Sequence, residues 1–562
     1  MQYARSVGRS ALLALTLLSA CAASQPSPRS DAGLKPTGAV GDYLAGRFAL
    51  SQGDYSVAAS SLLRAAAENP GDPDMTLEAF IACVQAGRPE AVTLARQLPD
   101  SQIAQLVLAD ADIKGGHWPA VEEIFHGLPR QGLTQFLQPL LVAWAQAGDG
   151  RTDTALATLR PYIESARFRS IFVLHGAMIA DLGKKQDEAA RLFHIAQGDL
   201  TEPNLRLAQI LANWQARSGQ PAEAQRTLAA LQTVAPDLGI AMPSMLSNVL
   251  KRPVTRAADG IAETYFTFAA LLRAQDQSDF SLVILRLALD LRPDFTAARL
   301  LAADILASRN QPQAASRLLA EVPASDPILP VVRLRRATLT ERIGHTDDAL
   351  RDLEQMSREH PDSPLPDEQR GDILRSKRRF ADAVSAYDRA ISRIAQPAAS
   401  DWVVFYDRGV AEEQSHQWPK AVADFKRALQ LSPDQPFVLN YLGYSWADQG
   451  HHLQEARRMI ELAAQRRPND GAITDSLGWV MFRQGDYAAA VKALERAVEL
   501  EPEDATINGH LGDAYWAAGR KTEAQYQWRR ALTMHPAPDD AAKLEAKLNG
   551  GGGHGGAVVS NP

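Results

Sequence analysis

Four prolines near the C-terminus recur at an almost constant interval. Pro433, Pro468, Pro502 and Pro536 are separated by 35, 34 and 34 residues. Proline has no backbone N–H and disfavours helix in the residue before it, so a proline at each of these positions ends a helix. The spacing predicts a chain built from similar units rather than one compact core, which would in any case be unusually large at 562 residues.

The composition favours helices as the content of these units. Alanine, leucine, glutamine and arginine are abundant, while isoleucine, valine and threonine are sparse. Straight-chain residues lose little rotamer freedom in a helix, whereas β-branched residues lose more. The sequence therefore predicts an all-α protein.

The pattern inside one unit indicates a pair of packed helices. In residues 471–504, Leu477 and Gly478 stand at positions seven and eight, Gly485 and Asp486 form a turn, and Ala490, Leu494, Ala497 and Pro502 follow at positions 20, 24, 27 and 32. Two helices approach closely where one presents glycine and the other fills the gap, so Gly478 is predicted to face Leu494.

This pattern resembles the tetratricopeptide repeat, whose period is about 34 residues. The resemblance implies a tetratricopeptide α-solenoid, a superhelix of about fourteen antiparallel helical hairpins in which neighbouring hairpins bury each other's apolar faces. Eight repeats are assigned to 262–538. Less regular hairpins are assigned to 39–237, where 39–72 fits the pattern well and the rest divides into 73–101, 102–133, 134–169, 170–203 and 204–237. The proline-containing segment 238–261 is predicted to connect the two arrays, and 539–562 to hold the end of a terminal helix and a disordered glycine-rich tail.

The first twenty residues read as an export signal. Arg5 and Arg9 precede a short apolar run, Ala11 to Leu18, that is too short to span a bilayer. The following residues, Leu18-Ser19-Ala20-Cys21, resemble the lipobox of bacterial lipoproteins, and this resemblance implies cleavage before Cys21 and lipidation of its thiol. The alternative is an ordinary secretory signal. Two or more acyl chains give stable membrane anchoring.

The residues after the cysteine bear on location. By resemblance to Gram-negative lipoproteins, Ala22 implies an outer-membrane lipoprotein that faces the periplasm. Residues 21–38 are rich in serine, proline and glycine and are predicted to be a flexible tether spanning roughly 20 to 25 Å.

The predicted binding site is a groove lined by the first helix of each hairpin. In tetratricopeptide proteins the ligand-facing residues lie at positions two, five, nine and twelve of that helix. In three successive repeats these positions provide the candidate groove residues Phe437, Asn440, Tyr444, Asp475, Trp479, Phe482, Asp513 and Trp516. The aromatic members could anchor a partner protein. The alternative is that they form inter-repeat core.

Other functional classes find little support. Phosphate loops, catalytic serine elbows and zinc spacings are absent, so we expect no enzyme, no cofactor and no metal site. Asp475 and Asp513 would repel a carboxylate, which disfavours binding of chaperone C-termini. The net charge of −7 becomes −9 once Arg5 and Arg9 are removed, which argues against nucleic acid. Cys83 reads as a small buried hydrophobe, and the turn containing His451 and His452 as solvated.

The stretch 439–532 carries a more specific resemblance. Its segments Leu439-Asn440-Tyr441-Leu442-Gly443-Tyr444, Thr474-Asp475-Ser476-Leu477-Gly478-Trp479 and His510-Leu511-Gly512-Asp513-Ala514-Tyr515-Trp516 are similar to the C-terminal part of proteobacterial tetratricopeptide lipoproteins. This group includes adaptors that hold periplasmic carboxyl-terminal processing proteases and deliver peptidoglycan hydrolases to them. The resemblance implies a lipid-anchored scaffold with such partners. The alternative functions are a scaffold for assembly or export of outer-membrane proteins, pili or polysaccharide, and an enzyme within 73–261.

Overall fold

The computed structural model describes residues 38–130, 134–164, 169–198 and 204–550. Within these residues every regular element is a helix and no strand occurs, which confirms the all-α prediction. None of the helices in these ranges combines the length and apolarity that crossing a bilayer requires. The predicted signal segment, Cys21, the tether up to residue 37 and the tail from residue 551 lie outside the described residues.

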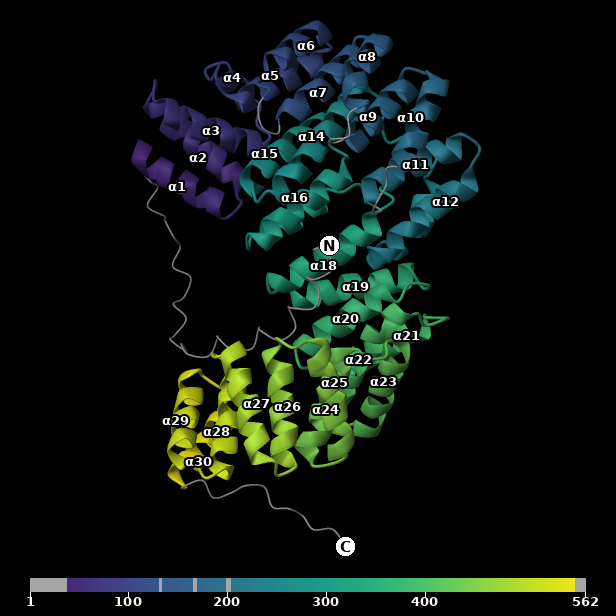
Figure 1. The fold of residues 1–562 in the computed structure, drawn as a ribbon. Coiled ribbons are helices and arrows are strands. Elements are labelled where there is room, and N and C mark those ends of the chain that lie inside the picture. The colour runs from purple at the N-terminus through teal and green to yellow at the C-terminus, as the bar shows by residue number, and fades with distance from the viewer. Residues whose placement is uncertain (1–37, 131–133, 165–168, 199–203, 551–562) are drawn as a thin grey trace. The chain divides into compact units, whose positions relative to one another are not determined.

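Contacts divide the chain into two compact units with their boundary at residues 366 and 367 (Figure 1). The unit 27–366 contains α1 (Ala39–Ser51), α2 (Tyr55–Glu68), α3 (Pro73–Ala86), α4 (Glu90–Ala95), α5 (Gln102–Gly115), α6 (Trp118–Gly127), α7 (Thr134–Gly148), α8 (Thr152–Ile163), α9 (Arg169–Leu182), α10 (Gln186–Gly198), α11 (Leu205–Arg217), α12 (Pro221–Ala229), the 3-10 helices η1 (Ala230–Thr233) and η2 (Pro236–Ala241), α13 (Met242–Ser247), α14 (Ala257–Ala274), α15 (Ser278–Leu291), α16 (Thr296–Ser308), α17 (Pro312–Ala320), α18 (Leu329–Arg342) and α19 (Thr346–Glu359).

The second unit comprises residues 367–562. Its helices are α20 (Leu365–Ser376), which starts just before the boundary, α21 (Phe380–Ser392), the 3-10 helix η3 (Ala399–Asp401), α22 (Trp402–Gln414), α23 (Trp418–Leu431), α24 (Pro436–Gln449), α25 (Leu453–Arg466), α26 (Gly471–Arg483), α27 (Tyr487–Leu500), α28 (Ala505–Ala517), α29 (Lys521–Thr533) and α30 (Pro538–Asn549).

Consecutive helices pair into fourteen hairpins, six before η1 and eight from α14 to α29, as the tetratricopeptide solenoid predicts. The segment 238–261, predicted to be a connection, interrupts the hairpins with most of η2, with α13 and with the start of α14. This segment lies inside the unit 27–366, so the boundary between the compact units falls elsewhere.

A glycine facing a large side chain recurs in the hairpins and explains their close packing. A Cβ added at Gly478 would lie 2.5 Å from Leu494 Cγ, which confirms the predicted pair. Six hairpins place the large residue sixteen positions after the glycine: Gly46 with Leu62, Gly176 with Leu192, Gly371 with Tyr387, Gly409 with Phe425, Gly478 with Leu494, and Gly512 with Trp528. Gly443 faces Ile460, seventeen positions later, because the turn at His451 and His452 contains one extra residue. The first helix can therefore approach the second to a distance that a Cβ would prevent.

Aspartate side chains cap the start of several helices in the unit 367–562, among them α27 and α28. Asp486 accepts a hydrogen bond from the backbone N–H of Ala489 (3.3 Å) at the start of α27. Asp504 accepts from the N–H groups of Thr506 and Ile507 (2.8 and 2.9 Å) at the start of α28. Each carboxylate satisfies N–H groups that the first helical turn leaves without a partner.

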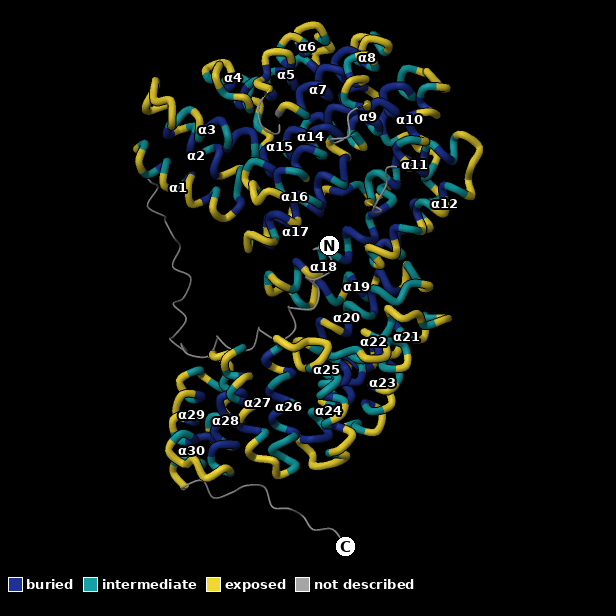
Figure 2. Tube along the Cα trace, in the orientation of Figure 1, coloured by how far each residue is buried: buried dark blue, intermediate teal, exposed yellow. Residues whose placement is uncertain are grey.

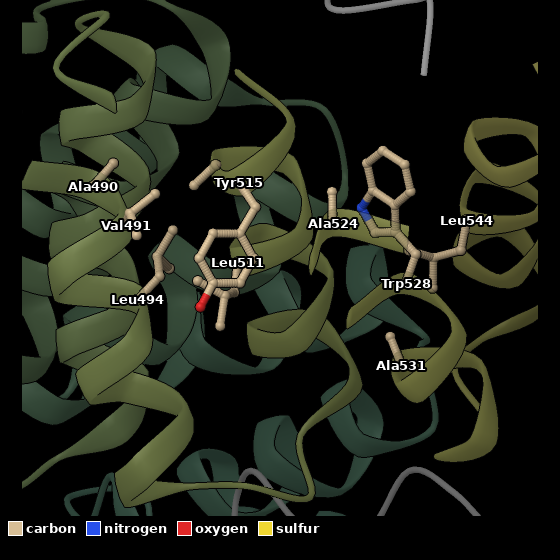
Figure 3. Packing of buried hydrophobic residues seen from close by; sticks show 10 residues of the cluster. Ala490, Val491, Leu494, Leu511, Tyr515, Ala524, Trp528, Ala531 and Leu544 are labelled. Carbon is tan, nitrogen blue, oxygen red and sulfur yellow. The ribbon is translucent and has the colours of Figure 1, made fainter. Parts of the chain in front are cut away.

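The last hairpins share one apolar core, which Figure 3 shows. Leu494 of α27, Leu511 and Tyr515 of α28, Trp528 of α29 and Leu544 of α30 are all buried in it. Apart from Leu544, Leu548 and its alanines, α30 is polar, with Asp539, Asp540, Lys543, Glu545 and Lys547 along its length. Helix α30 therefore caps this end of the array with a polar outer surface.

The unit 27–366 fills its own interior with a later hairpin. Helix α14 packs against α7 and α9, and α15 packs against α3 and α5 (Figure 1). Twelve of the eighteen residues of α14 are buried, and Figure 2 shows it as the dark-blue centre of this unit. The side of these early hairpins that a solenoid would offer to a partner is therefore covered by the chain itself.

Specific side chains fix α14 and α15 in this position. The Tyr265 hydroxyl donates to Asp110 (2.9 Å), and Lys114 forms an ion pair with Asp290 (2.5 Å). A Cβ on Gly260 would overlap the indole of Trp144. Trp144 Nε1 donates to Nδ1 of a buried histidine, His175 (2.9 Å), whose pKa is lowered to about 4 by burial, so the imidazole is neutral and can accept.

Candidate protein-binding face

The predicted site residues lie on the first helices of the hairpins in the unit 367–562. Helices α24, α26 and α28 are these first helices, and α26 packs against both of the others. We call their common side, marked by Tyr444, Asp475, Trp479 and Asp513, the first-helix face. The predicted stripe at positions two, five, nine and twelve therefore meets on one side of the unit.

An aromatic cluster lies at the middle of this face. The ring of Trp479 stacks on His510 with centroids 4.1 Å apart and planes at 18°, and on Phe482 with centroids 4.9 Å apart and planes at 14°. The ring of Tyr444 lies 6.4 Å from that of His510. All four side chains are half-buried, so each keeps part of its surface in water. We call Tyr444, Trp479, Phe482 and His510 the aromatic cluster.

Asp475 holds this cluster in place. It is buried, and its two carboxylate oxygens lie 3.0 and 2.9 Å from Nδ1 of His510. Burial lowers the pKa of His510, but the charge of Asp475 and its hydrogen bond outweigh burial, so the pKa is raised overall. The pair is then a charge-assisted contact that fixes the imidazole against Trp479, and Asp475 does not present a free carboxylate.

Asp513 is likewise used inside the protein. It accepts hydrogen bonds from Nε1 of Trp528 (3.0 Å) and from Nζ of Lys547 in α30 (2.7 Å). The ring of Trp516 lies 5.5 Å from that of Trp528, with the Lys521 ammonium 5.2 Å from its centroid. Trp516 is half-buried beside the terminal cap, and the predicted carboxylate repulsion at Asp513 is offset by Lys547.

Two polar atoms on the face lack partners. Oδ1 of Asn440 and Nε1 of Trp479 are inaccessible to water and make no hydrogen bond within the described residues. A buried polar atom without a partner costs about 1–3 kcal/mol. An incoming chain that reached them could recover part of this cost. The remaining predicted residue, Phe437, is half-buried with the Arg467 guanidinium 5.0 Å from its ring.

Helices α20 and α22 carry a group of acidic side chains, of which Glu368 and Asp372 stand at positions five and nine of their repeat. Asp372 accepts from the Tyr387 hydroxyl (2.7 Å), and Arg375 pairs with Asp407 (3.1 Å). The pKa of Glu368 is raised to about 7 by burial and then by neighbouring carboxylates, including Asp372 and Asp407. Arg375 lies between the carboxylates of Asp372 and Asp407, so these two acids are used inside the protein.

The sequence reasoning missed His510 and Lys547. Each lies one repeat period from its partner, 35 residues after Asp475 and 34 residues after Asp513. Comparing each acidic position with the two residues 34 and 35 positions later would have found both pairs.

Other sequence predictions can be located as well. Cys83 is fully buried and burial raises the pKa of its thiol to about 11, which confirms the buried hydrophobe. His451 and His452 are exposed, as predicted. They border a hollow between α23, α24 and α25 that is also lined by Trp418 and Trp446, away from the aromatic cluster. No group of three metal-ligating side chains occurs in the part of the chain that the structure describes.

Comparison with known families agrees with the hairpins. Residues 476–542 match the tetratricopeptide repeat family, and residues 253–405 match the tetratricopeptide repeat-like domain. The chain therefore contains tetratricopeptide repeats, which typically serve as protein-interaction scaffolds rather than catalysts.

Individual relatives match only in part. TPR repeat-containing protein PA4667 of Pseudomonas aeruginosa is 29% identical over 200 residues, which is 34% of this chain and 32% of that protein, so the match spans about a third of the relative. The crystal structure of the Cut9–Hcn1 hetero-tetramer of APC/C covers 90% of this chain and 95% of its own, at 16% identity and a TM-score of 0.37. Yeast Tom70 covers 91% and 95%, at 13% identity and a TM-score of 0.35.

Proposed function

We propose that this chain is a lipid-anchored periplasmic adaptor that binds other proteins through the first-helix face of the unit 367–562. Its tetratricopeptide hairpins provide the scaffold, and the sequence Leu18-Ser19-Ala20-Cys21 provides the anchor. An anchored adaptor raises the effective concentration of whatever it holds near the membrane.

The aromatic cluster is the observation that carries this proposal. Trp479 is fixed between His510 and Phe482, so little side-chain entropy is lost when a partner packs against it. Interfaces draw most of their affinity from a few such rigid aromatic anchors. By contrast, the corresponding side of the early hairpins in the unit 27–366 is occupied by α14 and α15.

The class of partner follows from the resemblance of residues 439–532 to protease adaptors. We propose a periplasmic carboxyl-terminal processing protease, peptidoglycan hydrolases, or both.

Affinity capture tests the proposal. The acylated full-length chain is purified from detergent-solubilised envelopes after crosslinking in cells, and captured proteins are identified by mass spectrometry. We expect a protease or wall hydrolase with the natural chain and a loss of most of it with Trp479→Ala. Trp418→Ala removes a half-buried tryptophan outside the face and is the matched control.

Three results would argue against this function. Equal capture by the natural chain and Trp479→Ala, with equal helicity, would remove the aromatic cluster from the binding site. Recovery of export or assembly machinery instead would favour the alternative scaffold. Release of the chain from envelopes in the absence of detergent would contradict the anchor.

A further inference from the structure

Helix α1, the first helix of the described residues, carries an apolar stripe that the neighbouring hairpins do not cover. Val40, Leu44 and Phe48 are 73%, 61% and 68% exposed, respectively. They are four residues apart along α1 and so share one face of the helix. We call these three residues the α1 stripe.

The inward face of α1 is already satisfied. Asp42, Gly46 and Ala49 are buried against the rest of the unit 27–366. A Cβ on Gly46 would lie 2.6 Å from Leu62, and Arg64 forms an ion pair with Asp42 (2.6 Å). The α1 stripe is thus a second apolar face on a helix that has completed its intramolecular packing, and Figure 2 shows parts of α1 as exposed.

The outer faces of the two terminal helices, α1 and α30, differ in polarity. At the C-terminal end, α30 is polar apart from Leu544 and Leu548, which pack inward on the last hairpin. Terminal helices of repeat arrays usually carry a polar outer face, because nothing stacks on them. The α1 stripe departs from that rule, so it requires a partner of its own.

The area of the stripe discriminates between occupants. The three side chains together expose on the order of 300 Å² of apolar surface. A stable pairing with a second copy needs about 800 Å² per partner, so the stripe is too small for a dimer of free molecules. A small apolar face is sufficient where another attachment already holds the protein at the surface, because the second contact is then effectively intramolecular.

We propose that the α1 stripe inserts into the phospholipid interface of the membrane that holds the lipid anchor. This inference rests on the proposed lipidation of Cys21. Eighteen residues lie between Cys21 and Val40, and the nineteen steps along the chain reach at most about 65 Å, so α1 can meet the bilayer. The helix then lies in the interface with Leu44 and Phe48 among the upper acyl chains.

The main experiment measures insertion directly. The acylated full-length chain, with Cys83→Ala to remove the other thiol, carries Leu44→Cys labelled with an environment-sensitive fluorophore. It is reconstituted on vesicles of phosphatidylethanolamine and phosphatidylglycerol with or without brominated acyl chains. We expect bromine to quench the label at position 44 several-fold more than the same label at Tyr526→Cys, an exposed site on α29.

A second measurement separates the stripe from the anchor. The unacylated Cys21→Ser chain should bind the same vesicles more weakly than the acylated chain, and Leu44→Asp with Phe48→Asp should lower this bound fraction about tenfold. Leu250→Asp with Tyr526→Asp removes two equally exposed apolar side chains elsewhere and should leave the bound fraction unchanged. All four positions are exposed, and circular dichroism confirms that each variant is folded.

The outcomes are distinct. Equal quenching at positions 44 and 526 while the chain stays on the vesicles overturns the inference but leaves the anchor intact. Loss of the acylated natural chain from vesicles contradicts the anchor, and the unacylated arm then still tests the stripe. A dimer in light scattering that Leu44→Asp abolishes, without vesicle binding, identifies a second copy as the occupant and overturns the inference. Loss of partner capture in Trp479→Ala, with quenching at position 44 still several-fold stronger than at position 526, supports both the first-helix face and the membrane contact of α1.

Discussion

Substitution of Gly478 by alanine is the sharpest test of how the hairpins are held together. The new Cβ would lie 2.5 Å from Leu494 Cγ, 2.9 Å from its Cδ2 and 3.2 Å from its backbone nitrogen. A rotation of the leucine side chain relieves the first two contacts but not the third, so α26 and α27 must separate. Overpacking of this kind costs about 1–3 kcal/mol.

A gain in helix propensity offsets part of this cost. Alanine is about 0.8–1 kcal/mol better than glycine inside a helix. We therefore expect Gly478→Ala to destabilise the pair α26 and α27 by about 1–2 kcal/mol. Gly509 in α28 provides the matched control, because its Cβ would meet Leu544 at an ordinary 3.6 Å, and Gly509→Ala should gain most of the propensity term.

The assay must report on one hairpin, because a chain with two compact units does not unfold in a single step. Native-state hydrogen exchange of the amides of α26 and α27 gives the free energy of local opening. Urea unfolding followed by circular dichroism gives the global effect. In the combination of Gly478→Ala with Leu494→Ala the two contacts with the leucine side chain are absent and only the contact with its backbone nitrogen remains, so the two changes should couple by about 1 kcal/mol or more. If Gly478→Ala increases the protection of the α26 and α27 amides as much as Gly509→Ala increases that of the α28 amides, the close-packing explanation is wrong.

Three further predictions concern other contacts. Gly260→Ala should destabilise the unit 27–366 by about 1–3 kcal/mol, seen as a lower urea midpoint, because its Cβ overlaps Trp144; an unchanged midpoint would mean that α14 can shift freely. Because the pKa of His510 is raised, the stability from its pair with Asp475 is complete below the reference pKa of 6.5 and is lost as the pH rises through the raised value. The urea midpoint should therefore fall with rising pH, and this fall should be smaller in Asp475→Asn. Lys547→Met should speed hydrogen exchange in α30 by a few-fold, since this partly exposed ion pair contributes no more than about 1 kcal/mol; unchanged exchange would show that Leu544 alone docks the cap.

Much of the fold could be predicted from the sequence because the residue pattern of one packed hairpin recurs in each repeat. The offset between Gly478 and Leu494 recurs in six hairpins, so one pair indicates the others. Even the extra residue at the His451 turn appears in the sequence as a spacing of 35 between prolines.

The filling of the unit 27–366 could not be predicted in this way. The contact between Tyr265 and Asp110 joins residues 155 positions apart, and that between Gln311 and Ser51 joins residues 260 apart. A periodic pattern specifies neighbours in the series but contains no information about contacts between distant repeats. The predicted groove residues illustrate the same limit, since position within a repeat placed Asp475 on the face but did not reveal its charge partner.

The placement of α14 and α15 also determines the order in which the parts of this protein can fold. Ordinary repeat arrays can begin folding anywhere and extend outward one unit at a time. In the unit 27–366, however, hairpins made early have an interior that stays open until residues 257–291 have been synthesised. The ion pair of Lys114 with Asp290 closes a loop of 176 residues, and such long-range closure slows folding. The hairpins from α1 to α10 must therefore remain incompletely packed, with apolar surface that needs protection from aggregation, until α14 and α15 have been synthesised.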